Sequence, residues 1–340
     1  MREEIATDAI DPAQQTSRIT LWRLGNERYR LCVNVHHMVT DTWSCMVLQR
    51  ELPRLYAQQR GGGPASLPAV GWQFGQFTAY QRRQLAGDGF RRHRQYWAAQ
   101  LAGAGAPRLP LSAPARGART RATVRRDIDV ATARVLRQLA VTCRVTLFTI
   151  LLSLFKVLLR AISGHPDLTV ATLFANRSRP ELEHTVGFIA NIVLLRSRID
   201  GCSVLADVVS RVHESVVGGI AHQEFPIHTA TPRISGDGHG RLDRVVFQML
   251  GERIDQTHQA GDVQFRWLVP DLQGRFDFEL AVMPLEGDGL GVKLDYSADA
   301  MSGAWAGEFL RAYVELAAAV AAAPSQPVDE IAALIARPLS

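Results

Sequence analysis

The hydrophobic pattern of the first third of the chain predicts a β-hairpin followed by a helix. Residues 19–25 and 28–35 are rich in aliphatic and aromatic side chains and are separated by two polar residues, which predicts two paired strands. Beyond this hairpin, apolar positions recur at helical spacing to about residue 60, and Ser44 is the predicted N-cap of the helix. Pro53 lies inside the pattern and predicts a kink or a new turn.

A second helical stretch is predicted from Trp72 to Leu101, with aromatic side chains as its anchors. Residues 102–120 are rich in Gly, Ala and Pro, a composition typical of a linker. We therefore expect two lobes, an N-terminal one in residues 1–110 and a C-terminal one in residues 111–340.

The remainder of the chain mixes helices and strands. The predicted elements are a long buried helix from a Thr146 cap to Ser163, strands at Asp167–Phe174 and Ile189–Arg196, an amphipathic helix at Ser203–His222, strands near 242–250, 275–283 and 289–296, and a helix from about Ser302 to Pro324. Loops are predicted at 176–183 and 228–241. Because strict βαβ alternation is missing, the pattern favours a two-layer α/β (α+β) fold with large mixed sheets.

The composition is that of a globular protein, with 340 residues, 47% hydrophobic and 21% charged. The four cysteines lack CxxC or ligand spacing, which argues against a disulfide scaffold and a structural zinc site. The longest apolar run, 147–162, contains two charged residues and is shorter than the roughly 20 residues that span a membrane. The polar, acidic N-terminus is unlike a secretory signal. We expect a cytoplasmic protein with no membrane partner.

The net charge is +5, and almost all of the positive charge is arginine, because lysine occurs only at positions 156 and 293. The arginines are scattered among acidic residues and lack the interleaved aromatic side chains that stack on bases, which argues against nucleic-acid binding. A modest positive charge favours an acidic protein partner by electrostatic steering.

The most informative segment for chemistry is VNVHHMVTDTWS, residues 33–44. His36 and His37 end an apolar strand, where burial would keep an imidazole neutral and able to accept a proton, as a general base requires. Asp41 is placed to orient the loop by pairing with an arginine or a backbone amide. The alternative is that both histidines are structural. A zinc site is less favoured, because adjacent strand residues point in different directions and no third ligand has suitable spacing.

The segment HHMVTDTWS resembles the HHxxxDG motif of the condensation domains of nonribosomal peptide synthetases, a superfamily that also contains the chloramphenicol acetyltransferases. Other segments resemble the family's motifs in the same order along nearly the whole chain. They are FGQFTAYQRRQL (74–85), RQYWAAQLAGA after it, ANRSRPELEHTVGFIANIVLLR (175–196), HQEFPI (222–227), LDRVVFQML (242–250), FDFELAV and GVKLDYSADAMS.

The resemblance implies a chloramphenicol acetyltransferase-like pseudo-dimer of two lobes with a tunnel between them. Donor and acceptor substrates, acyl groups and amines or hydroxyls, would arrive on the phosphopantetheine arms of acyl or peptidyl carrier proteins, with no intrinsic cofactor and no metal. His37 would accept a proton from the attacking amine or hydroxyl or position it, and Asp41 would maintain the site. The implied catalytic set is His37, His36, Asp41 and Thr42, and the implied tunnel residues are Trp43, Ser44, Gly187 and Asn191.

Two departures from the family pattern bear on activity. Thr42 replaces the motif's glycine; it still supplies a backbone N–H for an oxyanion, but a β-branched residue fits badly if the position needs a positive φ. The family's opening motifs are absent, which predicts an incomplete N-terminal lobe with exposed apolar surface and an open sheet edge. The same absence raises the question of whether the chain contains the arginine that would pair with Asp41.

The leading hypothesis is a condensation enzyme that forms an amide or ester bond in nonribosomal peptide or hybrid polyketide biosynthesis. His36 argues against the heterocyclisation subtype, and Trp43 preceding Ser44 favours a condensation-type member over an epimerisation domain. The alternative is a catalytically degenerate, condensation-like domain that binds carrier proteins or recruits a tailoring enzyme. A third hypothesis is an acyltransferase that uses a soluble acceptor.

Overall fold

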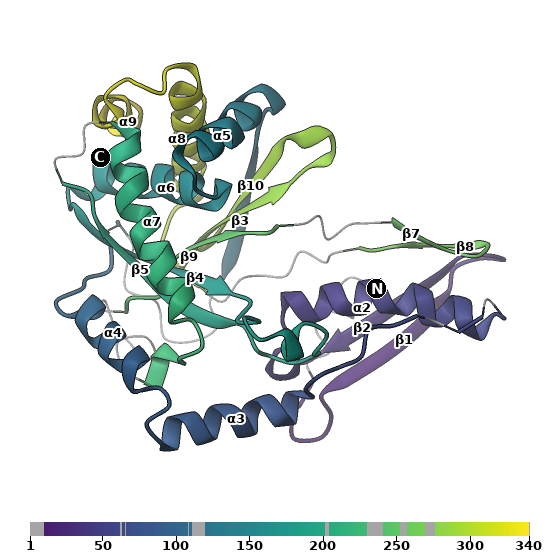
Figure 1. Ribbon diagram of the computed structural model, residues 1–340. Coiled ribbons are helices and arrows are strands. Elements are labelled where there is room, and N and C mark those ends of the chain that lie inside the picture. The colour runs from purple at the N-terminus through teal and green to yellow at the C-terminus, as the bar shows by residue number, and fades with distance from the viewer. Residues whose placement is uncertain are drawn as a thin grey trace. The chain divides into compact units, whose positions relative to one another are not determined.

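A computed structural model describes residues 10–61, 63–64, 66–107, 109–110, 120–200, 204–229, 241–251, 257–268 and 276–339 (Figure 1). Its contacts divide the chain into two compact units. Unit 1 comprises residues 1–89, 175–190 and 256–267, and unit 2 comprises residues 90–174, 191–255 and 268–340. The predicted linker at 102–120 lies partly outside the described residues, and the lobe boundary at residue 110 stays a prediction.

Unit 1 begins with the predicted hairpin, which is confirmed as β1 (Ser17–Arg23) and β2 (Tyr29–Val35). The two strands pair antiparallel in a two-stranded sheet, and their side chains alternate between an exposed and a half-buried face. The exposed face is the apolar one, with Ile19 67%, Leu21 61%, Tyr29 57%, Leu31 41% and Val33 39% exposed. The expectation that β2 is a buried strand is therefore wrong.

Helix α2 (Thr42–Gln59) follows the hairpin after a short 3-10 turn at His37–Val39. Its N-cap is Asp41, whose side chain accepts a hydrogen bond from the Ser44 amide, so the prediction of Ser44 as the cap is wrong. An aspartate is as good a cap as a serine, and here it lies three residues earlier. The helix continues through the buried Pro53 without a break in its helical residues.

Helix α3 (Phe74–Ala86) covers a small apolar core in unit 1. The core consists of Phe77, Leu182 and Ile189, with Trp72 and Phe74 packed against it. The single helical stretch predicted from Trp72 to Leu101 is corrected to two helices. The first helix, α3, ends at the Gly87 C-cap, and the second, α4 (Arg91–Leu101), belongs to unit 2.

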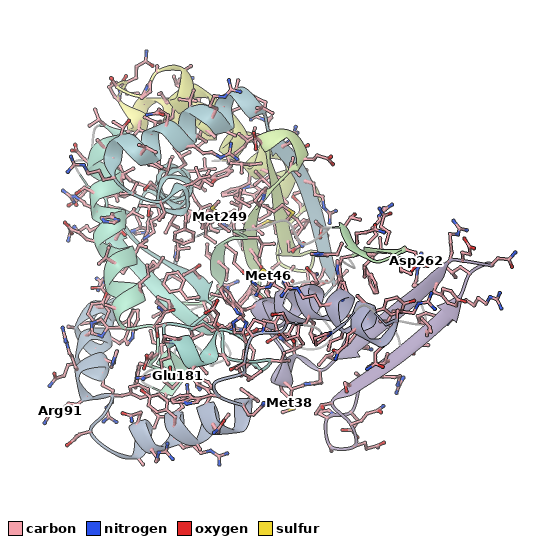
Figure 2. The ribbon with its side chains drawn as sticks, turned by 45° about the vertical axis from the view of Figure 1, so that its right-hand side comes forward. Met38, Met46, Arg91, Glu181, Met249 and Asp262 are labelled. Atoms are coloured by element: carbon pink, nitrogen blue, oxygen red, sulfur yellow. The ribbon has the colours of Figure 1, made fainter. Side chains whose placement is uncertain are left out.

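A second hairpin, β7 (Thr257–Ala260) and β8 (Val263–Arg266), also belongs to unit 1, although the sequence pattern did not predict it. It packs on α2: the rings of Tyr56 and Phe265 meet edge to face with centroids 5.4 Å apart. Asp262 lies in the turn between the two strands (Figure 2). Its carboxylate is 3.7 Å from the guanidinium of Arg60, at the end of α2.

The centre of unit 2 is a six-stranded mixed sheet in the order β3-β10-β9-β6-β4-β5. The β4–β6 and β6–β9 pairs are parallel and the others are antiparallel, as expected for a mixed rather than a doubly wound sheet. The strands are β3 (Arg121–Ile128), β4 (Asp167–Phe174), β5 (Asn191–Arg198), β6 (Val245–Met249), β9 (Phe278–Pro284) and β10 (Leu290–Ser297).

Helices α6, α7 and α8 pack on this sheet (Figure 1). The helices of unit 2 besides α4 are α5 (Val130–Cys143), α6 (Leu147–Ser163), α7 (Leu205–Ala221), α8 (Gly303–Ala322) and α9 (Val328–Ala336). The predicted cap of α6 is confirmed, because Thr146 accepts the hydrogen bond that begins this helix, and Gly164 ends it in the left-handed region. Helix α8 begins after Ser302, close to the predicted start, and the Ser302 side chain is its N-cap.

Helix α6 is the core helix, and residues 149–159 are buried without interruption. Among the described residues, no single helix is long and apolar enough to cross a membrane; α5 and α6 reach that length only together, with a bend of 105° between them.

Several boundaries and elements differ from the sequence prediction. The strand expected at Ile189–Arg196 begins instead at Asn191, because Gly187–Ala190 forms a separately fixed turn. Strand β3 and helices α5 and α9 were not predicted. The glycine-rich loop predicted at 228–241 lies mostly outside the described residues.

Candidate active site

The Asp41 carboxylate is the centre of the hydrogen-bond network at the start of α2. Its Oδ1 accepts hydrogen bonds from the Ser44 amide (2.8 Å) and from the Arg177 guanidinium (3.0 Å). Its Oδ2 accepts from Arg177 (2.9 Å) and from the amides of Ile189 and Ala190 (3.0 Å each). One carboxylate thus joins the N-terminus of α2 to the segment 175–190, far away in sequence but in the same unit.

The Asp41–Arg177 ion pair is bidentate and buried, with 2% of each side chain exposed. Burial by itself raises the pKa of Asp41, but the hydrogen bonds and charge of Arg177 together with the Ser44 hydrogen bonds outweigh it and hold that pKa below its usual value. The expectation that Asp41 pairs with an arginine or a backbone amide is confirmed on both counts. The concern that its arginine is missing from the chain is answered, because Arg177 fills that role.

Ser44 fixes the turn at residues 187–190. Its hydroxyl accepts a hydrogen bond from the Gly187 amide (3.0 Å), and its single proton lies within reach of Asp41 Oδ1 (2.7 Å) and the Gly187 carbonyl (2.9 Å). A side chain at Gly187 would place its Cβ 2.4 Å from the Phe74 ring, which explains the glycine. Ser44 is fully buried, and the tunnel role expected of Ser44 and Gly187 stays a prediction.

The two histidines have opposite hydrogen-bonding roles. His37 Nδ1 lies 2.7 Å from the Thr40 carbonyl oxygen, which can only accept, so Nδ1 carries the proton and a neutral His37 has its lone pair on Nε2. His36 Nδ1 accepts a hydrogen bond from the Met38 amide (3.1 Å), which places the proton of its neutral ring on Nε2. His37 is exposed and His36 half-buried.

The ring of Phe188 lies against His37. The ring centroids are 4.9 Å apart with an interplanar angle of 67°, an edge-to-face contact. Phe188 lies in the segment that Asp41 and Ser44 hold, so the histidine of the motif and the network around its aspartate meet at this side chain.

The other motif residues lie in the first turn of α2. Thr42 is exposed and is the first helical residue, and its φ is not positive, so no strain arises from its β-branched side chain. Its amide and that of Trp43 are in the turn where backbone N–H groups have no intrahelical partner. The Trp43 indole donates to the Glu183 carbonyl (2.8 Å), and the Arg177 guanidinium lies 5.7 Å from its ring centroid.

Asn191 belongs to unit 2, unlike the other candidates. Its buried amide group donates to the carbonyls of Gln223 (2.8 Å) and Phe225 (2.7 Å) in the segment 222–227. These bonds give Asn191 a structural role, and its predicted contact with substrate stays a prediction.

Sequence reasoning missed Arg177 as a site residue. The segment ANRSRPELEH was noted, but nothing in spacing alone indicates which of its arginines faces an aspartate located 136 positions earlier. The structure supplies the signal: Asn176 adopts a left-handed conformation (φ 56°), and its side chain donates to the Ile189 carbonyl (3.1 Å). This backbone reversal turns Arg177 toward Asp41.

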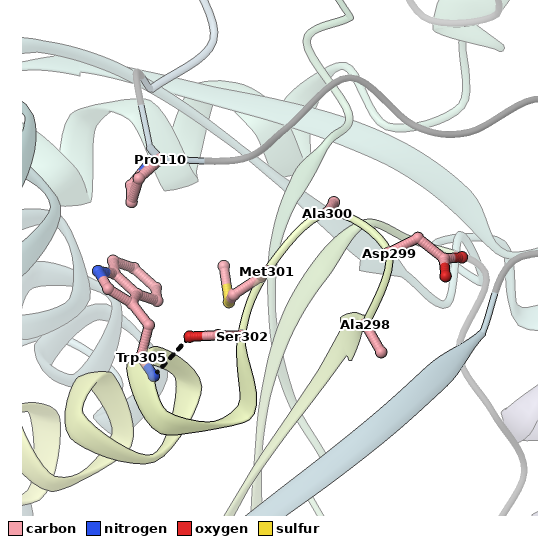
Figure 3. Close-up of a pocket in the computed structure, with 7 residues that line it drawn as sticks. All are labelled: Pro110, Ala298, Asp299, Ala300, Met301, Ser302 and Trp305. Carbon is pink, nitrogen blue, oxygen red and sulfur yellow. Dashed lines mark hydrogen bonds between the residues drawn. The ribbon is translucent and has the colours of Figure 1, made fainter.

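A pocket of about 380 Å³ opens in unit 2 around Trp305 and the turn before α8 (Figure 3). It contains none of the candidate site residues; it is lined by Pro110, Ala298, Asp299, Ala300, Met301, Ser302 and Trp305. In the described parts of the chain, no group of three or more His, Cys, Asp or Glu side chains could hold a metal ion.

Known proteins share both the sequence pattern and the fold of this chain. The sequence model of the condensation domain family matches residues 13–337. N-(5-amino-5-carboxypentanoyl)-L-cysteinyl-D-valine synthase of Amycolatopsis lactamdurans is 31% identical over 317 aligned residues, and the alignment covers 91% of this chain. The chain spans only 8% of the length of that synthase.

Two solved structures show the same fold. The first condensation domain of the calcium-dependent antibiotic synthetase, in complex with a substrate analogue, has a TM-score of 0.73 at 20% identity, over 93% of this chain and 69% of that one. The X-domain from teicoplanin biosynthesis, in complex with OxyB, has a TM-score of 0.82 at 20% identity, over 97% and 76% of the two chains. The expected fold, that of the chloramphenicol acetyltransferase-like condensation domains, is confirmed.

Proposed function

From the premise that this chain belongs to the condensation domain family of nonribosomal peptide synthetases, we propose that it joins two carrier-tethered substrates by an amide or ester bond. The donor is an acyl or aminoacyl thioester on the phosphopantetheine arm of one carrier protein. The acceptor is an amine or hydroxyl group on a second. No intrinsic cofactor takes part, and the phosphopantetheine supplies only the thioester and its tether.

The observation that carries the proposal is the hydrogen bond of 2.7 Å between His37 Nδ1 and the Thr40 carbonyl. It leaves the lone pair of Nε2 on an exposed ring, where it can accept the proton of the attacking amine or hydroxyl. The new C–N or C–O bond forms at the thioester carbonyl, the C–S bond breaks, and the proton passes through His37 to the leaving thiolate. Holding both tethered substrates in place contributes to the rate as well.

Other motif residues have supporting roles in this proposal. Thr42 presents its backbone N–H at the start of α2, where a developing oxyanion is favoured by the unpaired amides and the helix dipole. Asp41, through its bonds to Arg177 and Ser44, maintains the geometry and transfers no proton. His36 fixes the 3-10 turn through the Met38 amide and keeps His37 in place. Trp43, Ser44 and Gly187, all in unit 1, shape the substrate path.

The test is a condensation assay read by intact-protein mass spectrometry, with donor and acceptor loaded on carrier proteins. We expect product from the wild-type chain and from His258→Ala, a histidine of the same unit outside the Asp41 network, and a loss of at least about 100-fold in His37→Ala. A parallel arm offers free amines and alcohols, because product there without an acceptor carrier would instead indicate an acyltransferase with a soluble acceptor. Equal product from wild type and His37→Ala would overturn the proposal.

A second function is favoured by the exposed apolar face of β1 and β2, since contiguous exposed apolar surface marks interaction sites. In this alternative, the chain is a degenerate condensation-like domain that binds carrier proteins or recruits another enzyme. The X-domain solved in complex with OxyB is an example of such an assembly built on this fold. A folded chain that binds carriers but gives no product, and whose binding is lost in Leu21→Ser/Leu31→Ser, would favour this alternative.

A further inference from the structure

The Asp41 carboxylate makes no hydrogen bond to His37 among the described residues, although both belong to the same motif. Its partners are Ser44, Arg177 and the amides of Ile189 and Ala190. If the aspartate influences the histidine, the influence passes through another group. Within the part of the chain that the structure describes, the aromatic ring in contact with His37 is that of Phe188.

Phe188 is the central residue of a tight turn that is fixed on both sides. The Ile189 amide donates to the Gly187 carbonyl (3.0 Å), which closes a three-residue γ-turn around Phe188. On one side, Gly187 is held by the Ser44 hydroxyl and by the Phe74 ring. On the other side, Ile189 is buried in the core of unit 1, and its amide is also bonded to Asp41. Because the turn is held on both sides, the backbone of Phe188, from which its ring projects, is fixed in position.

His37 has few other restraints, because it is exposed on a short 3-10 turn. The hydrogen bond from Nδ1 to the Thr40 carbonyl fixes one atom of the ring and the tautomer. The ring is joined to the chain through Cβ–Cγ, and rotation about that bond would break the hydrogen bond to Thr40 and release the tautomer. The edge-to-face contact at 4.9 Å opposes that rotation, and it thereby maintains both the hydrogen bond and the direction of Nε2.

We propose that Phe188 is a positioning residue for His37, and that the Asp41–Arg177 ion pair acts on the histidine through the Gly187–Ala190 turn and the Phe188 ring. The aspartate of the motif then acts indirectly, because it fixes the amides that place Phe188. The catalytic consequence rests on the proposed function, whereas the positioning of the ring does not.

The first experiment replaces the aromatic edge and retains most of the volume. Phe188→Leu should lower kcat for condensation about 2- to 13-fold with little change in KM, the range expected for losing one aromatic pair. Phe188→Tyr should restore most of kcat. The matched control is Phe265→Leu, which removes an edge-to-face contact with Tyr56 in the same unit and should leave kcat unchanged. A loss of activity in Phe265→Leu equal to that in Phe188→Leu would overturn the proposal.

The second experiment observes the ring without requiring activity. Side-chain nitrogen NMR of histidine-labelled protein, with His37 assigned by comparison with His37→Ala, should show the Nδ1–H tautomer in the wild type. In Phe188→Leu the ring can rotate about Cβ–Cγ and leave the Thr40 carbonyl, so the His37 nitrogen shifts should move toward the average of the two tautomers. Unchanged His37 shifts in Phe188→Leu would overturn the positioning role, whether or not the wild type is active. If the shifts change in Phe188→Leu but the wild type gives no product, only the proposed function is contradicted.

The third experiment tests the route from the aspartate. Asp41→Asn should shift the His37 signals as Phe188→Leu does, and the double variant should shift them no further, because both changes act at one contact. If Asp41→Asn does not fold, Ser44→Ala takes its place, since it releases Gly187 on the other side of the turn. Additive shifts in the double variant would show that Asp41 acts independently of Phe188.

Discussion

The Asp41–Arg177 ion pair allows a quantitative test of what stabilises the candidate site. In Asp41→Ala the buried guanidinium loses its counter-charge, and the amides of Ile189 and Ala190 lose their acceptor. Removing one partner of a buried pair costs about 3–5 kcal/mol, and the orphaned amides add to that cost before relaxation. We expect Asp41→Ala to lower the free energy of unfolding by about 4–5 kcal/mol.

The opposite truncation should cost less. In Arg177→Met the carboxylate of Asp41 keeps the amides of Ser44, Ile189 and Ala190 as hydrogen-bond donors, so its charge stays solvated by the protein. We expect a loss of about 2–3 kcal/mol. The double variant should be more stable than Asp41→Ala alone, because it contains no uncompensated buried charge.

The assay is urea unfolding followed by circular dichroism, with stability taken from midpoints at unchanged slope. Arg211→Met serves as the control: its pair with Asp200 is 45% exposed on each side, and its loss should cost less than about 1 kcal/mol. Since the pKa of Asp41 is lowered by folding, its contribution is complete above the usual aspartate value and declines as the pH falls through the folded value. The difference between wild type and Asp41→Ala should therefore shrink below about pH 4. An Arg177→Met loss as large as that of Asp41→Ala, or additive losses in the double variant, would refute the reasoning.

Three further substitutions test single features of the fold. Burial lowers the pKa of Lys156 from its usual 10.5 to about 7, although its Nζ donates to the Leu195 carbonyl (2.8 Å), so Lys156→Met should stabilise the fold by about 1–4 kcal/mol at pH 6. That gain in stability should grow as the pH falls from 10 to 7, because in this range Lys156 is protonated in the unfolded state but not in the folded state. The gain should level off below about pH 7, where both states are protonated. A pH-independent gain in calorimetry would contradict the lowered pKa. Thr42→Gly should destabilise by about 0.3–0.5 kcal/mol and change condensation activity less than about twofold, since Thr42 begins a helix without a positive φ; a large gain in activity would show that the side chain obstructs the site. Arg144 caps α5 with φ 55°, so Arg144→Gly should raise the urea midpoint by an amount equivalent to about 0.5–1 kcal/mol, and a lower midpoint would be inconsistent with strain there.

Periodicity and caps were sufficient to predict the elements whose sequence signals are local. The hairpin of β1 and β2, the Thr146 cap and Ser163 end of α6, strand β4 and the start of α8 near Ser302 agree with the prediction. Each of these depends on residues close together in the chain. The errors have local causes too: an aspartate three residues before Ser44 took the cap, and Gly87 divided the predicted long helix.

The sequence by itself determined the family, the HHxxxD segment and the acidic residue in it, because those are properties of residue identity and order. Only the tertiary structure decided which arginine pairs with Asp41, which tautomer His37 adopts and which ring contacts it. Those answers depend on contacts between residues 36–44 and residues 175–190, and no local sequence pattern predicts these contacts. The physical reason is that a buried carboxylate takes as partners whatever donors the fold brings to it, here an arginine turned inward by Asn176 and amides of a turn that packing holds in place.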